Sequence, residues 1–410
     1  MTDTVNPVRF ELSAREQKYA YENMLLPDTV FVMKDEVDPD ALCRAARAAV
    51  RFHPLFGTRL VKETLYYLDE TPLWEQHPEG ALIGGGGDGP CLWKIKLRGK
   101  EIVLWGAHVL TDWGGMFRFA ATLLHLYLEN TGVKFDASAD CDFPISVEAT
   151  TADARKDFAS LPCAPVGTPK FPAASPLPEA LFDRERKGGL HCLTFAESSV
   201  RRFATQSETS VFSVIACLLA RSIRNSFDMS EGSIIVRVPV DYRRAFMSAT
   251  EHNFSQGFSL CYRPEKMDRL TDARVETAFR SQLDLYVDRD QMIRTLQKDM
   301  ERLKRLEDGS DTFTALDKFS EEACHPAAYI IYSHITRTGF SEGLSGRIER
   351  IYAVPHSDVP YTMLAFTVSF GGNISTTLYQ HAADGRLIGA LKRELERREI
   401  GYELTEFYDK

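Results

Sequence analysis

His108 and Asp112, four positions apart, are the residues of this 410-residue chain best suited to do chemistry. The histidine ends the apolar, β-prone stretch 101–108, and the aspartate lies in the turn before an apolar helical pattern at 116–129. A neutral imidazole can remove a proton from a reacting group near neutral pH. The same spacing fits a core histidine beside an aspartate that caps the helix, so the spacing alone leaves both interpretations open.

Several other polar residues are expected to be structural or solvated. They are His381 with Asp384, His356, His252, and Cys324 with His325. A turn after the last strand accounts for His381 and Asp384. Adjacent residues rarely present both side chains to one point, so Cys324 and His325 are not expected to form a nucleophilic dyad.

The cysteines and glycines exclude two common kinds of site. The eight cysteines are scattered and include no CxxC pair, so we expect reduced, mostly buried thiols and neither a disulfide framework nor a zinc site. The glycine-rich run 84–89 lacks the Lys-Ser/Thr that would reach a nucleotide phosphate. We expect it to be a surface turn that joins two strands.

Composition narrows the class of protein. Hydrophobic residues make up 44% and charged residues 26%, which is ordinary for a soluble globular protein. The net charge of −9 argues against sequence-independent binding to nucleic acid or anionic membranes. The chain starts without a signal-peptide pattern, and its most apolar stretch, 211–220, is about half of a membrane span. We therefore expect a soluble, cytoplasmic, multi-domain protein.

The first half of the chain supplies the elements that position His108. The stretch 10–26 is expected to be a helix that leads into a strand. Asp38, with Pro39 after it, caps a helix that ends at His53-Pro54, because proline lacks an amide donor and clashes with the preceding turn. Three short strands are expected at 28–34, 65–68 and 92–97.

The second half repeats this mixture of helices and strands after a proline-rich window. Residues 161–178 contain six prolines and are expected to be a linker. The boundaries that follow are 1–160 for the first unit, 161–185 for the linker and 186–410 for the second unit. Strands are expected at 190–195, 233–240, 258–262, 348–354, 363–370 and 374–381, and helices at 199–205, 211–227, about 271–306 and 385–398. Two α/β units are predicted.

Four passages, in this order along the chain, carry a family resemblance. They are Asp38 through His53-Pro54-Leu55 to Thr58-Arg59, then His108-xxx-Asp112, then Pro239-Val240-Asp241-Tyr242-Arg243 with Asn253-Phe254, and finally Tyr332-Ser333-His334 with Gly339. Together they resemble the chloramphenicol-acetyltransferase-like superfamily, which includes peptide-synthetase condensation domains and alcohol acetyltransferases. The resemblance spans nearly the whole chain.

The resemblance implies two α/β subdomains packed as a V with a tunnel between them. An acyl thioester, on coenzyme A or on the phosphopantetheine arm of a carrier protein, would enter one face, and an alcohol or amine acceptor the other. His108 would act as general base without a covalent enzyme intermediate, and no cofactor or metal would be bound permanently. A monomer would be sufficient, because both units lie in one chain.

The resemblance also assigns supporting residues. Asp112 would be structural, within a turn that includes Trp113 and Gly114, and held by an arginine. Arg59 is the first candidate for that arginine and Arg51 the second. The residues expected to line the tunnel are Asn253, Ser333 and His334.

Three residues depart from the family pattern. Ala107 stands where condensation domains carry a first histidine, which argues against peptide-bond condensation more than against acyl transfer. Trp113 separates Asp112 from Gly114, where it could reshape or block the tunnel, and His334 replaces an asparagine. Two alternatives to a coenzyme A-dependent acyltransferase therefore stay open: a catalytically silent binding or interaction protein, and a carrier-dependent condensation or release enzyme.

Overall fold

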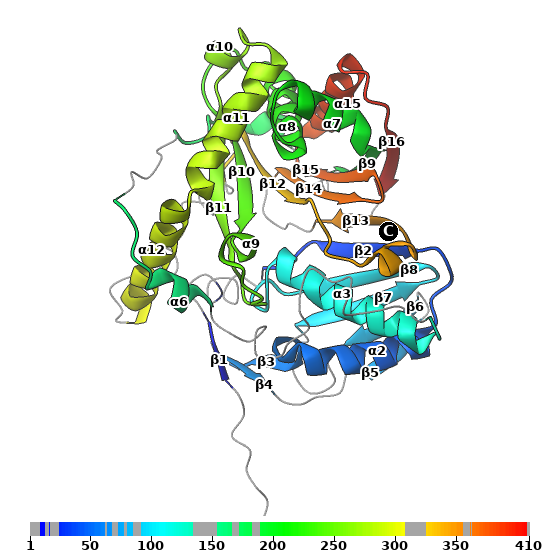
Figure 1. Ribbon diagram of the computed structural model, residues 1–410. Helices are drawn as coiled ribbons and strands as arrows, with labels where there is room; N and C mark the ends of the chain where they lie inside the picture. The colour runs from blue at the N-terminus through cyan, green and yellow to red at the C-terminus, as the bar shows by residue number, and fades with distance from the viewer. Residues whose placement is uncertain are drawn as a thin grey trace, which may run out of the picture.

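The computed structural model describes residues 9–12, 16, 24–61, 64–67, 73–77, 80–84, 92–133, 154–165, 172–182, 189–307, 325–355, 361 and 363–407. These residues form two large sheets, one above the other in Figure 1, with helices on their outer faces. The lower sheet has the strand order β13-β2-β8-β7-β6-β5 and the upper sheet the order β11-β10-β12-β14-β15-β9-β16. A small third sheet has the order β1-β4-β3.

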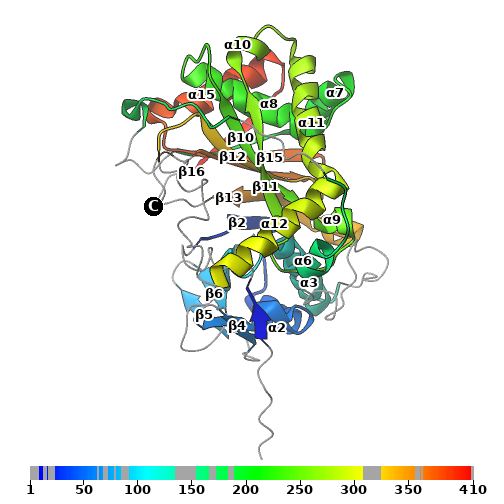
Figure 2. The same cartoon turned by 90° about the vertical axis from the view of Figure 1, so that its left-hand side faces the viewer.

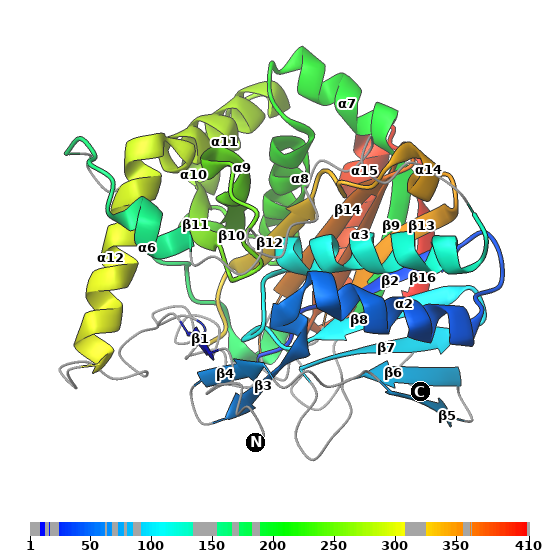
Figure 3. The same cartoon turned by 60° about the horizontal axis from the view of Figure 1, so that its bottom comes forward.

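The lower sheet and its helices come mainly from the first third of the chain. Its elements are β2 (Asp28–Met33), α2 (Pro39–Phe52), β5 (Leu73–His77), β6 (Gly80–Gly84), β7 (Trp93–Arg98), β8 (Glu101–Gly106) and α3 (Trp113–Asn130). Buried and less buried residues alternate along β7 and β8, so one face of each strand is buried. Helices α2 and α3 lie side by side over this sheet (Figure 3).

Helix α2 begins and ends where the sequence predicts. The Asp38 carboxylate accepts hydrogen bonds from the amides of Asp40 (2.9 Å) and Ala41 (3.2 Å), and Pro39 occupies the first turn. The helix ends at His53, before Pro54 begins the short 3-10 helix η1 (Pro54–Gly57). The predicted cap and stop are confirmed.

The upper sheet and its helices come from the rest of the chain. Its strands are β9 (Gly189–Ala196), β10 (Ile234–Asp241), β11 (Ser255–Tyr262), β12 (Tyr329–Ile335), β14 (Met363–Phe370), β15 (Asn373–Gln380) and β16 (Glu403–Phe407). Its helices are α7 (Glu197–Gln206), α8 (Val211–Ser226), α9 (Arg243–Phe246), α10 (Pro264–Met267), α11 (Asp272–Val287), α12 (Arg289–Glu307) and α15 (Arg386–Arg397). The apolar helix α8 lies in the middle of this second core.

Some elements pack across the boundaries drawn from the sequence. Strand β13 (Ile348–Val354), expected within the second unit, pairs antiparallel with β2 and so completes the lower sheet. Figure 2 shows it between β2 and the upper sheet. Helix α6 (Ala154–Ala159), expected within the first unit, packs through Phe158 on the second core. Val30, Cys192 and Tyr352 form a small apolar cluster that joins the two sheets.

Two other expectations differ from the structure. The helix expected at 10–26 starts instead as β1 (Arg9–Glu11), in which Phe10 pairs with Leu65 of β4 (Thr64–Tyr67) beside β3 (Thr58–Val61). The helix expected at 271–306 is two helices, because Asp288 takes an extended conformation and its carboxylate caps α12 through the Gln291 amide (3.1 Å).

The part of the chain that the structure describes contains no single helix long and apolar enough to cross a membrane, and α7 with α8 meets that test only as a pair bent by 95°. Five cysteines lie within that part, and all are free thiols. Cys163 is half-buried, and the other four are buried: Cys43, Cys192, Cys217 and Cys261. The glycine-rich run lies between the paired strands β6 and β7, and its residues after Gly84 are outside the described ones.

Candidate active site

His108 lies where the chain leaves strand β8. Its amide donates to the Met24 carbonyl (2.8 Å), and the preceding Ala107 forms an isolated bridge with Leu25. Helix α3 begins at Trp113, three residues earlier than the predicted 116. The histidine therefore lies in a short turn between an apolar strand and a buried helix, two elements that fix both ends of the turn.

The hydrogen bonds of His108 define its tautomer. Its Nδ1 lies 3.0 Å from the main-chain carbonyl of Thr111. A carbonyl only accepts, so Nδ1 carries the proton and the lone pair of the neutral ring is on Nε2. The Asn253 side-chain amide donates to the His108 carbonyl (2.9 Å), which holds the main chain of the histidine as well. Half-buried His108 is thus fixed with Nε2 as the basic nitrogen.

Asp112 is a buried residue with several hydrogen-bonding partners rather than a second reacting group. Its carboxylate accepts from the amide of Gly115 (2.9 Å), which caps α3, and from the amide of Phe254 (2.8 Å). It also forms a two-pronged ion pair with Arg243, at 3.0 and 2.8 Å. Burial alone would raise the pKa of Asp112, but the charge and hydrogen bonds of Arg243 outweigh it and the pKa is lowered.

The arginine that holds Asp112 is Arg243, so the prediction of Arg59, or of Arg51 as second candidate, is wrong. Arg59 lies half-buried in β3, and Arg51 is exposed near the end of α2. Arg243 stands 131 positions from Asp112 in the sequence. It belongs to the Pro239–Arg243 passage that carried the family resemblance, which was the available signal.

Arg243 is buried with all of its donors occupied. Besides the two bonds to Asp112, its guanidinium donates to the carbonyls of Thr250 and His252 (2.7 Å each) and to the Asp241 carboxylate (3.0 Å). Five N–H groups therefore meet five acceptors. Burial lowers the pKa of Arg243, but the carboxylates of Asp112 and Asp241 raise it by more, so the side chain stays charged.

Residues 250–254, between β10 and β11, form what we call the clamp loop. Its carbonyls at Thr250 and His252 hold Arg243, and its Phe254 amide holds Asp112. The Glu251 carbonyl accepts from the Thr111 hydroxyl, and Asn253 reaches the His108 carbonyl. The upper unit thus contacts the His108–Asp112 turn of the lower unit at several points.

Glycine makes this close approach possible. A Cβ atom added to Gly115 would lie 2.7 Å from the Glu251 carbonyl oxygen. At Gly114, the glycine singled out in the sequence, it would lie 2.9 Å from an oxygen of the Asp241 side chain. The contact at Gly115 is with main chain, which cannot rotate away, so Gly115 is the stricter requirement and the sequence reading missed it.

Trp113 packs into the lower core. Its indole N–H donates to the Thr29 hydroxyl (2.9 Å), and its ring packs edge-on against Phe117 (5.7 Å) and against Phe366 of β14 (5.3 Å). The side chain is 6% exposed. Trp113, which distinguishes this turn from the family pattern, therefore lies between the two sheets.

Ser333 and His334 lie on β12, and the hydrogen bonds of His334 stay within the upper unit. The His334 Nδ1 lies 3.0 Å from the Tyr332 hydroxyl and its Nε2 lies 2.8 Å from the Ser369 hydroxyl. Burial lowers the pKa of His334 to about 3, so the ring is neutral. Of the residues expected to line a tunnel, Asn253 contacts the His108 carbonyl.

His252 is buried, so the expectation of a solvated histidine is wrong. Its Nδ1 lies 3.5 Å from the carboxylate of Glu16, which also pairs with Arg155 of α6 (3.0 Å) and accepts from the Asn253 amide (3.0 Å). The reason is the clamp loop, which places His252 between the two units.

Within the described residues, the other polar positions expected to be structural or solvated do not lie at the His108 turn. His381 contacts the Tyr379 hydroxyl, Asp384 lies in the turn before α15, and His325 is exposed. Cys324 and His356 are outside the described residues.

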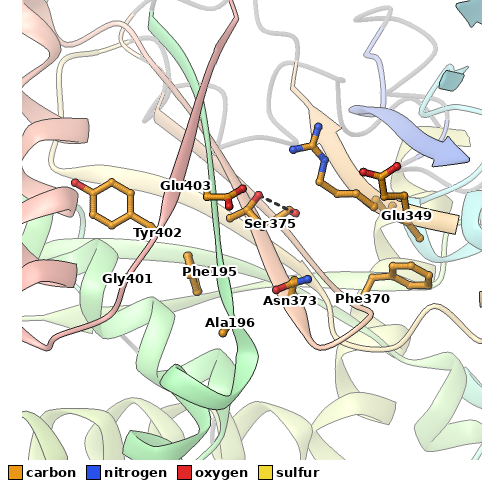
Figure 4. Close-up of a pocket in the computed structure, with 12 residues that line it drawn as sticks. Phe195, Ala196, Glu349, Phe370, Asn373, Ser375, Gly401, Tyr402 and Glu403 are labelled. Carbon is orange, nitrogen blue, oxygen red and sulfur yellow. Dashed lines mark hydrogen bonds between the residues drawn. The ribbon is translucent and has the colours of Figure 1, made fainter. Parts of the chain in front are cut away.

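A pocket of about 550 Å3 lies elsewhere, where the start of β13 faces β9, β15 and β16 (Figure 4). Phe195, Glu349, Asn373, Tyr402 and Glu403 are among its lining residues. None of the site residues predicted from the sequence lines it. Within the described residues, no group of three or more His, Cys, Asp or Glu side chains could hold a metal ion.

Comparison with known proteins identifies the fold. No family model and no curated protein sequence matches the chain. Among solved structures, it is similar to F. graminearum TRI101 complexed with coenzyme A and deoxynivalenol (TM-score 0.66, 12% identity, 96% of this chain and 99% of that one). It is also similar to the first condensation domain of the CDA synthetase (0.59, 14%, 95% and 95%) and to polyketide synthase associated protein 5 from Mycobacterium tuberculosis (0.56, 14%, 95% and 98%).

These similarities cover nearly the full length of each protein. The chain therefore has the α/β fold of the chloramphenicol-acetyltransferase-like proteins, and the predicted fold class is confirmed. The tunnel between the units stays a prediction.

Proposed function

We propose that this protein transfers an acyl group from a thioester to an alcohol or amine, with His108 as general base. The observation that carries the proposal is the bond from His108 Nδ1 to the Thr111 carbonyl, which leaves the lone pair on Nε2. The structures of F. graminearum TRI101 with coenzyme A support coenzyme A as the carrier of the acyl group, and similarity to a condensation domain supports a carrier-protein thioester as the second source.

The reaction then needs one base, which takes a proton from the acceptor and later gives it to the leaving group. Nε2 of His108 takes the proton of the acceptor hydroxyl or amine while the acceptor attacks the thioester carbonyl. The tetrahedral intermediate collapses as the carbon–sulfur bond breaks, and the imidazolium returns the proton to the leaving thiolate. The products are an ester or amide and a free thiol, and the enzyme is regenerated without a covalent intermediate.

Asp112 and Arg243 have a structural role in this proposal. Both side chains are buried, and their hydrogen-bonding positions are occupied by each other, by the cap of α3 and by the clamp loop. They keep the turn at the geometry in which His108 is presented. No permanently bound cofactor or metal is required.

The test is release of free thiol from a panel of acyl-coenzyme A donors with mixed alcohol and amine acceptors. We expect acceptor-dependent release by the wild type and a loss of about 100-fold or more in His108→Ala, the usual size of a general-base contribution. His325→Ala, which removes an exposed histidine, is the matched control and should keep the wild-type rate.

Two outcomes would point to the alternatives. If the wild type released thiol from a carrier-bound thioester but not from acyl-coenzyme A, the protein would be a carrier-dependent enzyme. If neither donor were turned over, the proposal would fail in favour of a catalytically silent binding protein.

A further inference from the structure

A buried histidine outside the His108 turn, His53, contacts the clamp loop through Glu251. It ends helix α2, with its amide bonded to the Ala49 carbonyl (3.0 Å), and its side chain is 4% exposed. Its Nδ1 contacts Oε1 of Glu251, and its Nε2 lies 2.7 Å from the Thr122 hydroxyl of α3. Both ring nitrogens are therefore engaged inside the protein, one with a buried carboxylate and one with a helix.

This pair is connected to the His108 turn by two hydrogen bonds. The main-chain carbonyl of Glu251 accepts from the Thr111 hydroxyl, and the main-chain carbonyl of Thr111 accepts from Nδ1 of His108. Glu251 thus faces His53 with its side chain and Thr111 with its main chain. A shift of Glu251 would move the acceptor of Thr111, and through Thr111 the acceptor that fixes the His108 tautomer.

The Glu251 carboxylate depends on His53 for its position. Glu251 is fully buried, and its second oxygen, Oε2, has no hydrogen-bond partner among the described residues. A buried polar group is costly to leave without its hydrogen-bonding contact, and without His53 the carboxyl group would be driven to move toward another partner or toward water. Loss of the His53 Nδ1 donor would therefore displace the clamp loop at Glu251.

We propose that His53 and Glu251 form a positioning pair that holds the Thr111 carbonyl against Nδ1 of His108. Neither residue needs to touch the substrate, and both act through Thr111. The proposal rests on the assignment of His108 as the base for its effect on turnover. Its structural part, the fixed tautomer of His108, can be measured without any turnover.

Two substitutions of His53 separate its two ring nitrogens. In His53→Asn, the amide nitrogen can stand near the place of Nδ1 and still donate to Glu251, while the contact with Thr122 is lost. In His53→Gln, the longer side chain can reach the Thr122 hydroxyl, while the donor to Glu251 is lost. Both variants are polar, so they are a matched pair, and thermal unfolding checks that each is folded.

We expect His53→Gln to lower kcat for thiol release by about tenfold or more with little change in KM, because small displacements of a catalytic group are costly. His53→Asn should keep kcat within about threefold of the wild type, a smaller loss on the same scale. A purely structural role would lower the stability of both variants without this split.

The second readout is the 15N NMR spectrum of histidine-labelled protein, with the His108 signals assigned by their loss in His108→Ala. We expect the Nδ1–H tautomer in the wild type and in His53→Asn, and a mixture of tautomers in His53→Gln. If His53→Gln is folded and keeps both the wild-type tautomer and kcat, the proposal is overturned. If the wild type has no turnover, the proposed function fails, but the tautomer comparison still decides whether the pair positions His108.

Discussion

Two histidines at strand ends, His108 and His334, have opposite surroundings. His108 uses Nδ1 to bond a main-chain carbonyl, and its turn is gripped by a loop from the other unit. His334 has both nitrogens bonded to hydroxyl groups, that of Tyr332 on its own strand and that of Ser369 on β14, and burial lowers its pKa to about 3. The bond that fixes its tautomer makes His108 a candidate base, whereas bonds from both ring nitrogens to hydroxyl groups are typical of a structural residue.

The largest effect should come from removing the arginine that holds the His108 turn. Arg243→Ala leaves the buried Asp112 carboxylate without its cation, and we expect a loss of about 3–5 kcal/mol in the free energy of unfolding. Urea unfolding measures it. The adjacent, exposed Arg244 is the control, and Arg244→Ala should stay within about 0.5 kcal/mol of the wild type. Equal effects of the two substitutions would contradict the role of Arg243.

Gly115→Ala should have the next largest effect. The new Cβ would lie 2.7 Å from the Glu251 carbonyl, so the clamp loop must move away from the His108 turn. We expect a loss of about 1–3 kcal/mol in stability and a lower rate of thiol release. Gly401→Ala, where an added Cβ meets nothing within 4 Å, is the control. A rate for Gly115→Ala equal to that of the control would show that the clamp loop is not needed for turnover.

Lowering the pH should reduce the stability that the ionised Asp112 carboxylate contributes. Its pKa is lower in the folded protein than the ordinary value near 3.9, so its ionised form contributes stability above that value. This contribution is lost as the pH falls through the lower, folded pKa. Urea midpoints between pH 7 and pH 3 should therefore fall more steeply for the wild type than for Asp112→Asn. Parallel curves would mean that the Asp112 ion pair adds no pH-dependent stability.

The smallest effect is expected at the second histidine of the comparison. Because the pKa of His334 is about 3, the ring is already neutral between pH 5 and pH 8. His334→Asn should therefore leave the shape of the rate profile over this pH range unchanged. A profile that loses a titration in this variant would make His334 part of the reaction.

The sequence predicts the local parts of the site because local signals fix them. Strand β8 and helix α3 follow from apolar periodicity, and the role of Asp112 as a helix cap follows from its position before that helix. The cap at Asp38 and the stop at Pro54 follow from single residues with strong conformational preferences. These elements place His108 in the turn between strand β8 and helix α3.

The contacts between units could not be predicted in the same way. Asp112 and Arg243 stand 131 positions apart in different units, and apart from the family resemblance nothing in their local sequences marks them as partners. His252 is buried for the same reason, since its ring lies against Glu16, which is far from it in the sequence. Strand β13 joins the lower sheet because β2 offers it an open edge there, which hydropathy does not reveal.

The central claim is tested most directly by chemical rescue of His108→Ala. We expect acceptor-dependent thiol release to be lost in this variant and partly restored by added imidazole, which can enter the vacated space and accept the proton. Arg243→Ala should not respond to imidazole, because its base is present and misplaced. A His108→Ala variant that releases thiol at the wild-type rate without imidazole would contradict the assignment of His108 as the base.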